Sequence, residues 1–424
     1  MSKRTPALGF IFITVLIDII GLGIVIPIFP DLFKELGGLT YGEAARVGGR
    51  LVTVYAVMQF IFSPILGGLS DKYGRRPVIL ISLIGLSIDY MFLALAPTIS
   101  LLFLGRLIAG ICGANFTTAS AYIADVSPPE KRAKNFGLLG AAFALGFIIG
   151  PAIGGLLGGF GLRVPFFVAG GLTLVNFLYG LFILPESLSK HERRPFSWKR
   201  ANPIGSLSQL KRNPIILGLA TAFFFIYIAS HSIQTNWSYF GAEVFDWKSK
   251  DIGPSLAVVG VMVAAVQGGL IGVATKKLGV KKTAYLGLFF NMLGLILFSI
   301  TKEVWMLYTF LAVYVLGGLA TPTIQGIMSS QLPNNEQGEL QGGLTSLMSL
   351  AAIFGPIIMT ETFFYFTEGA GSTEHYFPGA PFALGAVFSA ICFFLVFRVL
   401  QKTDDSSLPN PEKDKTVVAE PTPE

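Results

Sequence analysis

Long apolar segments separated by short polar breaks occupy most of this chain. A helix that crosses about 30 Å of hydrocarbon needs about 20 mostly apolar residues. Segments of that kind lie, with ends uncertain by several residues, at 7–29, 44–69, 77–96, 99–123, 135–159, 164–184, 214–240, 252–274, 282–300, 304–330, 338–366 and 381–400. These lengths favour helices over the strands of a membrane barrel, which need only about ten residues. The pattern therefore predicts an all-α membrane protein with twelve transmembrane helices.

Composition and charge placement agree with a bilayer. Hydrophobic residues make up 52% of the chain and charged residues 13%, and the mean hydropathy is +0.65. The first apolar segment runs on to Pro27 and Pro30 without a small-residue cleavage site, so it is expected to be retained rather than removed as a signal peptide. Basic residues cluster in alternate polar breaks, at 3–4, 72–76, 131–134, 185–213 and 276–282. Short basic loops stay on the cytoplasmic side, so both termini are expected in the cytoplasm.

The sequence repeats itself at an offset of 205 residues. Glycine positions match under this shift: Gly67 with Gly272, Gly74 with Gly279, Gly113 with Gly318, and Gly150-Pro151 with Gly355-Pro356. Such a repeat predicts two six-helix halves around a cavity near the bilayer midplane, which opens alternately to either side. The expected halves are 1–184 and 214–400, with a cytoplasmic linker at 185–213. The polar tail at 401–424 is expected to be disordered.

Two motifs in the first half resemble those of the major facilitator superfamily. The segment Gly67-Gly68-Leu69-Ser70-Asp71-Lys72-Tyr73-Gly74-Arg75-Arg76 is similar to the family pattern G-x-L-S-D-[RK]-x-G-R-R between the second and third helices. Leu102, Arg106, Gly110 and Gly113 resemble its fourth-helix pattern, L-x-x-x-R-x-x-x-G-x-x-G. The resemblance covers nearly the whole chain and implies a charged gate made of Gly67, Asp71, Gly74, Arg75, Arg76 and Asp125. Without it, the loop could be a plain topogenic signal.

The fifth apolar segment carries a stripe of small residues: Gly146, Gly150, Pro151, Gly154 and Gly155. Glycines at this spacing let another helix backbone approach closely. The stripe resembles the G-x-x-x-G-P-x-x-G-G motif of drug:proton antiporters within the superfamily, and by that resemblance it faces the other half and limits leak. Residues 122–125 and 87–90 are further similar to tetracycline efflux antiporters. That resemblance, the compact loops and the lack of an organelle address favour a bacterial inner membrane.

Ionisable residues within apolar segments are candidates for proton coupling, because a charge at the centre of a membrane helix costs at least about 2.5–3.5 kcal/mol. Asp18 lies in the first span, Asp89 in the third and Arg106 in the fourth. A carboxyl group in an apolar cavity can load a proton on one side and release it on the other. We expect Asp18 and Asp89 to bind protons and Arg106 to tune them, although a buried ion pair can also serve only to hold helices together. Glu361, late in the eleventh span, is a weaker candidate that could reach the outer surface.

Polar side chains in other spans are expected to contact substrate. They are Gln59, Asn115, His231, Gln234, Asn236, Gln267, Asn291 and Gln325. His231 could titrate near neutral pH or be a satisfied core histidine. The tetracycline exporters carry an acid in helix nine and a histidine in helix eight, where this chain has Asn291 and Val263. Because both groups are missing, the resemblance does not extend to tetracycline–metal recognition or to the exact proton stoichiometry.

The sequence thus predicts a proton-driven exporter of amphiphilic drugs, with tetracycline-like compounds among the candidates. The alternative is a proton-coupled transporter of a metabolite such as a sugar or organic anion. A non-transporting receptor would keep the same fold. No G-x-x-x-x-G-K-[ST] loop is present, so an ATP-driven pump or enzyme is not expected. Cys112 and Cys392 alone give no metal or disulfide spacing, and no cofactor is expected. No nucleic-acid motif accompanies the pI near 9.1.

Overall fold

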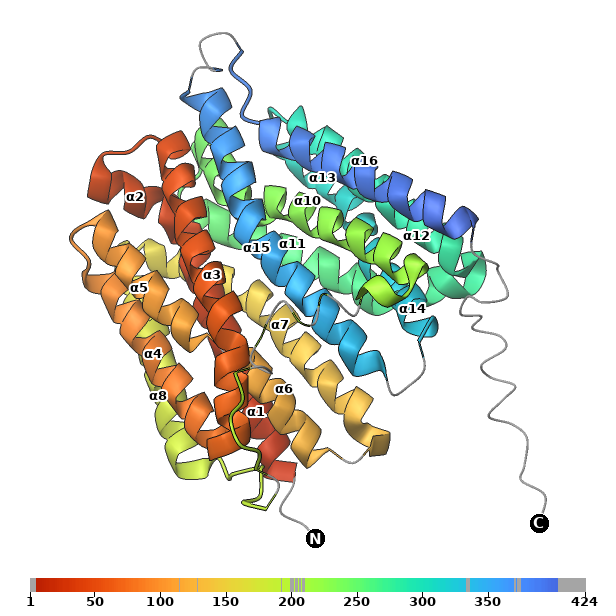
Figure 1. Ribbon diagram of the computed structural model, residues 1–424. Helices are drawn as coiled ribbons and strands as arrows, with labels where there is room; N and C mark the ends of the chain where they lie inside the picture. Colours follow the sequence, from red (N-terminus) through yellow and green to blue (C-terminus); the bar gives the residue numbers. More distant parts are fainter. Residues whose placement is uncertain are drawn as a thin grey trace. The chain divides into compact units, whose positions relative to one another are not determined.

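The computed structural model describes residues 5–113, 115–127, 129–191, 193–198, 202, 205, 207, 210–332, 336–369, 371 and 375–402. Within these residues the chain is helical, with helices of the length that membrane crossing requires (Figure 1). Asn115 falls at a helix start, but its side chain lies outside the described part. The predicted disordered tail lies outside it from residue 403 on.

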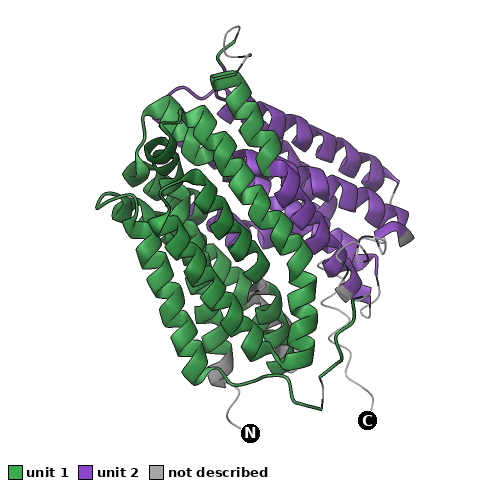
Figure 2. Cartoon of the chain, turned by 60° about the vertical axis from the view of Figure 1, so that its left-hand side comes forward, with its two compact units in different colours: residues 1–203, 235–260, 356–376 green, residues 204–234, 261–355, 377–424 purple. Residues whose placement is uncertain are grey.

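The helices form two compact units (Figure 2). Unit 1 contains residues 1–203, 235–260 and 356–376, and unit 2 contains 204–234, 261–355 and 377–424. Parts of α10, α11 and α15, which belong to the second half by sequence, therefore pack within unit 1. The units differ in this respect from the halves expected at 1–184 and 214–400, and that division stays a prediction from the repeat.

The first part of the chain supplies most of unit 1. Its helical elements are α1 (Thr5–Val25), η1 (Ile26–Ile28), α2 (Phe29–Gly37), α3 (Tyr41–Tyr73), α4 (Arg75–Leu95), α5 (Ile99–Cys112), α6 (Asn115–Val126), α7 (Pro129–Gly158) and α8 (Val164–Ile183). α1 packs most extensively on α7, and α4 on α8. A core that includes Phe10, Ile11, Leu83 and Tyr122 joins α1, α4 and α6. Burial of these apolar faces against one another holds the helices together.

The remaining helical elements follow the linker. They are η2 (Leu210–Arg212), α10 (Pro214–Phe245), α11 (Ser249–Ala265), the π-helical turn η3 (Val266–Leu270), α12 (Ile271–Ser299), α13 (Val304–Val315), η4 (Leu316–Leu319), α14 (Ala320–Ser330), α15 (Gln337–Thr367) and α16 (Ala380–Gln401). In unit 2, α12 packs most extensively on α16. Leu219, Phe223, Leu288 and Ile324 lie in the core of this unit.

Eleven helical runs among the described residues are long and apolar enough to cross a membrane. One of them, Ser249–Ser299, has 51 residues and would be about 75 Å long as a straight helix, more than twice the hydrocarbon thickness. Gly279 interrupts it with φ 78° and ψ 164°, which only glycine adopts readily. The run therefore contains two of the predicted spans, 252–274 and 282–300, and the twelve expected segments are accounted for.

The backbone also carries the sequence repeat. Gly74 and Gly279 match under the 205-residue shift, and both have positive φ, 109° and 78°. The helix breaks at Gly113 and at η4, which contains Gly318, match in the same way. The turn expected over residues 67–76 is shorter than predicted, because α3 stays helical to Tyr73 and the chain breaks only at Gly74.

Candidate functional site

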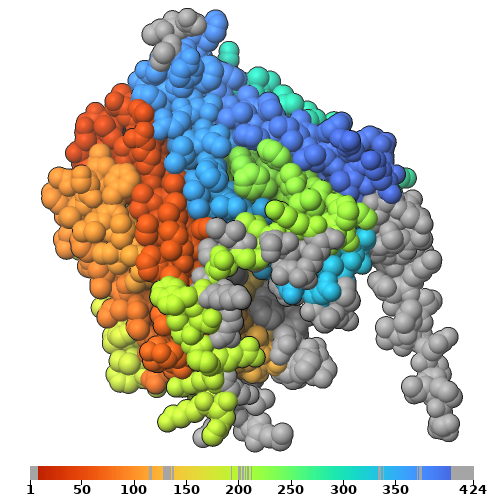
Figure 3. Space-filling model, viewed as in Figure 1, coloured from red at the N-terminus to blue at the C-terminus, as the bar shows by residue number. Residues whose placement is uncertain are grey.

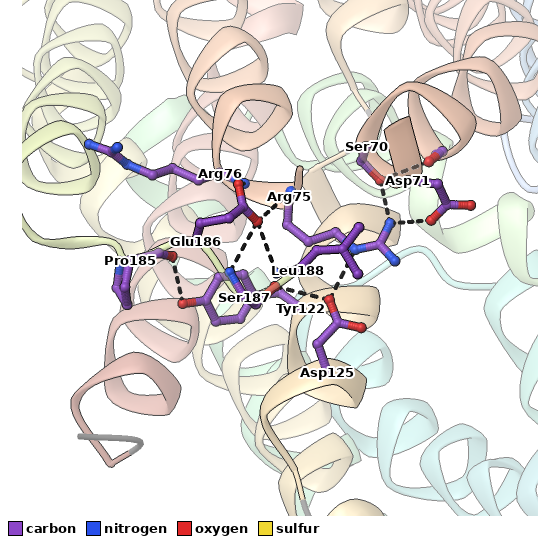
Figure 4. A network of polar contacts seen from close by, with 11 residues as sticks. Ser70, Asp71, Arg75, Arg76, Tyr122, Asp125, Pro185, Glu186, Ser187 and Leu188 are labelled. Atoms are coloured by element: carbon purple, nitrogen blue, oxygen red, sulfur yellow. Dashed lines mark hydrogen bonds and ion pairs between the residues drawn. The ribbon is translucent and has the colours of Figure 1, made fainter. Parts of the chain in front are cut away.

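The buried guanidinium of Arg75 organises a polar network where α3 meets α4 (Figure 4). Its Nη1 donates to Asp71 Oδ1 and to Ser70 Oγ, each at 2.6 Å. Its Nε donates to Asp125 Oδ2 at 3.1 Å. The Arg75 side chain is only 10% exposed, so these charge-assisted bonds compensate for the loss of water around it. The structure therefore brings Asp71, Arg75 and Asp125 together, as the sequence predicted for a gate.

Glu186, which the sequence analysis missed, binds the first turn of α4. One carboxylate oxygen accepts from the backbone N–H of Arg75 at 2.8 Å, and the other accepts from that of Arg76 at 3.3 Å. The start of a helix leaves backbone donors unpaired and carries partial positive charge, so a carboxylate stabilises it. The same group accepts from the backbone of Ser187 and Leu188. The only feature of the sequence that pointed to Glu186 was its position directly after Pro185, at the end of the sixth span.

The linker after α8 continues across this network. Ser187 Oγ donates to Asp125 Oδ2 at 2.9 Å, and the Tyr122 hydroxyl donates to the Pro185 carbonyl at 2.9 Å. Farther on, the Arg194 N–H donates to the Asp71 carbonyl. Figure 3 shows the linker residues in yellow-green on the surface beside the red-orange end of α3. The first part of the predicted linker is therefore a docked element of unit 1 and contributes to the candidate gate.

The three remaining gate positions have backbone and helix-end roles. The Gly67 carbonyl accepts from Ser70 Oγ at 2.7 Å. Arg76 Nη2 donates to the Leu181 carbonyl at 2.6 Å, at the end of α8. A Cβ at Gly74 would collide with the Glu186 carboxylate, in addition to the strain of its positive φ.

Two buried charges pair in the interior of unit 1. Asp89 on α4 is 0% exposed and Arg106 on α5 is 7% exposed. The guanidinium forms an ion pair with the Asp89 carboxylate, and Arg106 Nε donates to Asp89 Oδ1 at 3.2 Å. Gly105 leaves room for this carboxylate, because a Cβ there would stand 2.9 Å from Asp89 Oδ1. The pairing that the sequence allowed for Arg106 is thus with Asp89.

Asp18 is buried on α1 of the same unit. One turn further along α1, a Cβ at Gly21 would stand 2.7 Å from the hydroxyl oxygen of Tyr90 on α4. Arg106 Cζ lies 5.9 Å from the centre of the ring of Tyr55 on α3. Gln59, one of the expected substrate contacts, donates to the Tyr55 hydroxyl at 3.2 Å. The sequence analysis missed Tyr55 because a tyrosine in an apolar span has no distinctive pattern.

The glycine stripe on α7 packs mainly against α1. A Cβ at Gly150 would stand 2.7 Å from the Ile20 carbonyl oxygen, and Gly146 and Gly154 meet Ile19 and Ile24. Gly155 and Pro151 meet a segment from the second half of the sequence: a Cβ at Gly155 would stand 2.9 Å from Gly253 Cα, and a Cβ at Gly253 would collide with the Pro151 carbonyl oxygen. The expectation that the stripe as a whole faces the other half is therefore wrong for its first three glycines, because α1 is the helix that they admit.

A second ionic cluster in unit 1 involves Glu361 on α15. Arg46 Nε lies 2.9 Å from one Glu361 oxygen, and Arg50 Nη2 lies 2.8 Å from the other. The Arg46 guanidinium also stacks 4.6 Å from the centre of the Phe364 ring. These side chains are 33–48% exposed, in line with the expected position of Glu361 near a surface. The sequence did not predict which residues pair with Glu361.

Further polar contacts in unit 1 lie near the start of α11. Asp31 accepts from the Ser249 hydroxyl at 2.9 Å, and Lys248 Nζ donates to the Tyr41 hydroxyl at 3.2 Å. The bond to Tyr41 raises the pKa of Lys248, so the lysine is charged at neutral pH.

The predicted polar residues of unit 2 differ in burial, and three of them bond nearby polar side chains. Asn291 accepts from the Ser389 hydroxyl at 3.0 Å, and Gln325 donates to Gln341 at 2.9 Å. His231 is buried against Gly355. Gln234 donates to Ser230 at 3.0 Å and is exposed, as is Gln267 in η3. Asn236, whose part of α10 belongs to unit 1, is buried and donates to Thr235 at 3.2 Å.

The described residues contain no group of three or more His, Cys, Asp or Glu side chains suited to a metal ion. Cys112 and Cys392 are both free thiols.

Comparisons with known proteins agree on one class. The sequence model described as Major Facilitator Superfamily matches residues 11–356 and, in a second match, 264–422. The chain is 38% identical to the class C tetracycline resistance protein of Escherichia coli, over 92% of this chain and 96% of that protein. It is 31% identical to multidrug resistance protein 2 of Bacillus subtilis strain 168, over 84% and 90% of the two chains. A bacterial homologue of the human lysosomal transporter Spinster, in an inward-facing and occupied conformation, has the same fold with TM-score 0.80 and 16% identity, over 97% of this chain and 99% of that one.

Proposed function

We propose that this chain, which belongs to the Major Facilitator Superfamily, is a secondary active transporter that exports amphiphilic drugs in exchange for protons. The superfamily consists of transporters rather than enzymes, and the relatives at 31–39% identity are tetracycline and multidrug resistance proteins. Transport would proceed by alternating access, with no covalent chemistry and with the proton gradient as the energy source.

The observation that carries this proposal is the set of charges buried in the membrane-spanning helices of unit 1. Asp18, Asp89 and Arg106 are each less than 10% exposed. Ionisable groups at such positions are expensive to keep and mark proton relays or substrate paths. Asp89 is held by Arg106 in an ion pair. In this proposal Asp18 carries the proton and the Asp89–Arg106 pair responds to its charge.

The Arg75 network would act as the cytoplasmic gate. It joins α3, α4, α6 and the linker through Asp71, Asp125 and Glu186. Breaking one of these bonds would shift the balance between conformations by about 1.5–3 kcal/mol, the usual value for a charged hydrogen bond. Both termini would then face the cytoplasm, and the membrane would be a bacterial inner membrane.

The substrates are proposed to be amphiphilic compounds, with tetracycline as one candidate among several. Tetracycline resistance proteins of several classes are similar to this chain. Asn291, bonded to Ser389, stands where the resemblance led us to expect an acid. This neutral centre favours a wider set of compounds over a tetracycline–metal chelate held by carboxylates.

The test is substrate-evoked proton release in inverted vesicles energised by respiration. Tetracycline and several unrelated cationic dyes are added while a pH-sensitive dye reports the gradient. Vesicles with the wild-type protein are expected to lose part of the gradient on addition of a transported compound, and Asp18→Asn vesicles are expected to show no response.

Asp246→Asn is the matched control, because Asp246 is exposed and has φ 55°, a conformation that asparagine also tolerates. This variant should respond like the wild type. A full response in Asp18→Asn vesicles would overturn the role of Asp18. The absence of a response to any drug, with folded protein present, would favour the transport of a metabolite such as a sugar or organic anion.

A further inference from the structure

The first end of α3 packs tightly on the last part of α15, and both segments belong to unit 1. A Cβ at Gly49 would collide with the hydroxyl oxygen of Thr360, and a Cβ at Gly42 would stand 2.5 Å from Thr367 Oγ1. Both threonines are buried, 1% and 7% exposed. The Thr360 hydroxyl donates to the Pro356 carbonyl at 2.7 Å, which fixes its direction. The two glycines therefore form recesses into which these side chains of α15 fit.

Two arginines on the same part of α3 bind α15 as well. Arg46 and Arg50 pair with Glu361, and Arg46 stacks on Phe364. Positions 42, 46 and 49 lie on one face of a helix, so the glycines and the arginines meet the same partner. The ion pairs are 33–48% exposed and contribute little, because water and salt screen them. The steric fit at the glycines should thus hold the two helices together more firmly than the charges do.

Segments of α10 and α11 complete this contact with the second half of the sequence. A Cβ at Gly48 would collide with the hydroxyl of Tyr239, a buried side chain on α10. At the start of α11, Ser249 donates from its backbone N–H and its hydroxyl to Asp31 Oδ2, at 3.2 and 2.9 Å. A carboxylate stabilises a helix start, where backbone donors are unpaired. We call the contacts of Gly42, Gly48 and Gly49 with Thr367, Tyr239 and Thr360 the α3 seam.

The other end of α3 has partners of a different origin. The bonds described above for Ser70, Asp71, Arg75 and Arg76 all end on residues 67–194. One end of α3 is thus bound to the second half of the sequence, and the other end is bound to its own half and the linker. If the two halves move as bodies during transport, the contacts at the first end must break in each cycle.

We propose that the α3 seam is a second gate of the transporter, which is closed in this structure and parts when the cavity opens on the side of the membrane away from the Arg75 network. Its closure depends on the fit of Thr360, Thr367 and Tyr239 into the recesses of the three glycines. Such a fit has two discrete states, because a side chain either occupies its recess or leaves it. The inference rests on the proposed function, because it assigns one of the two gates that alternating access requires.

The first experiment holds the seam shut with a disulfide. Gly42→Cys and Thr367→Cys are combined in a chain whose native cysteines, Cys112 and Cys392, are replaced by Ala. Oxidation with an apolar copper complex should link the pair, because a Cβ at position 42 faces the hydroxyl of Thr367. The linked protein should lose nearly all drug-evoked proton release in inverted vesicles, and reduction should restore it.

Ser232→Cys with Gly385→Cys is the matched control. A Cβ at Gly385 would stand 2.7 Å from the Ser232 hydroxyl oxygen, but both residues belong to unit 2 and to the second half of the sequence. This disulfide should form and leave the proton release unchanged, because it does not join the two halves. Full proton release with the seam disulfide formed would overturn the proposal, and so would an equal loss in the control.

The second experiment opens the seam and needs no substrate. Gly49→Ala inserts a Cβ into the recess of Thr360, and a single thiol introduced by Thr367→Cys in the same cysteine-free chain reports the opening. The rate of its reaction with a water-soluble maleimide, in purified protein in detergent, should rise at least about fivefold, because overpacking forces neighbouring groups apart. Adding Thr360→Gly removes the colliding side chain and should return the rate toward its original value. Glu361→Gln should raise the rate less than Gly49→Ala does, because its ion pairs are exposed.

The proposed function and this inference can fail separately. An unchanged rate in folded Gly49→Ala, or a raised rate that Thr360→Gly does not lower, would overturn the gate, and the disulfide decides if Gly49→Ala does not fold. No drug-evoked proton release before oxidation would reject drug export, and the maleimide rates would then decide on the seam. Proton release that persists after the seam disulfide has formed would keep export and reject the gate.

Discussion

The interiors of the two units differ in charge although the backbone repeats. In unit 1, Asp18, Asp89 and Arg106 are buried. Under the 205-residue shift these positions become Phe223, Gly294 and Leu311, and the unit 2 interior is held instead by apolar packing and by Asn291 with Ser389. The breaks at Gly74 and Gly279 have nevertheless kept similar backbone angles. The repeat thus preserves the helical scaffold, whereas the buried Asp and Arg side chains of unit 1, and with them the proposed proton chemistry, have no charged counterparts at the matching positions of the second copy.

The largest expected effect comes from breaking the buried ion pair. Arg106→Leu leaves Asp89, which is 0% exposed, with an uncompensated charge, and this should cost about 3–5 kcal/mol of stability and abolish transport. Asn291→Ala removes one neutral hydrogen bond and should cost about 1 kcal/mol. Denaturant unfolding of the purified proteins in detergent measures both values.

A double variant separates packing from function at this pair. Asp89→Leu with Arg106→Leu removes both charges, so much of the stability should return while proton-coupled transport stays absent. Equal losses of stability in Arg106→Leu and Asn291→Ala would show that the two interiors do not differ as described. Transport by the double variant would show that the ion pair serves only to hold the helices together.

The two units also differ in the charges at the ends of the helices that match under the 205-residue shift. Asp71 binds Arg75 at 2.6 Å, whereas its repeat partner is the exposed Lys276. Asp71→Asn should lower export at least about tenfold, because a charged hydrogen bond is worth about 1.5–3 kcal/mol. Lys276→Gln should keep most of the activity. Export is normalised to the amount of protein in the membrane, and normal export by Asp71→Asn would contradict a gate at this network.

How far the sequence could predict these regions depends on the range of the interaction. Span positions and the burial of Asp18, Asp89 and Arg106 follow from local hydropathy, and the structure confirms them. The capping of α4 by Glu186 and the partners of Glu361 join residues more than a hundred positions apart, and no local pattern encodes such pairs. The glycine stripe shows the same limit: small residues predict that another helix packs closely, but they do not predict which helix it is.

The close contact of α7 with α1 in unit 1 predicts that alanine substitutions at two glycines of α7 change the stability in opposite directions. An Ala at Gly150 would place its Cβ 2.7 Å from the Ile20 carbonyl and 2.8 Å from Gly23 Cα, and neither backbone can move freely. Gly150→Ala should therefore destabilise by about 1–3 kcal/mol. Gly140, on the same helix, has nothing within 4 Å of such a Cβ, so Gly140→Ala should stabilise by about 0.5–1 kcal/mol. Thermal unfolding in detergent measures both, and a neutral Gly150→Ala would rule out a tight seam.

The smallest effect is expected at Glu361, where the charges of unit 1 reach the surface. Its pairs with Arg46 and Arg50 are 33–48% exposed, so each should contribute only about 0.2–1 kcal/mol. Glu361→Gln should lower the unfolding midpoint slightly at low salt, and the difference from wild type should shrink at high salt because exposed charges are screened. Glu303→Gln, at an exposed position in unit 2, should show no such salt dependence. A large loss of stability in Glu361→Gln that salt does not reduce would mean that this cluster, like Asp89 and Arg106, is shielded from water in the working protein. The difference in charge would then distinguish the two whole units and not only their interiors.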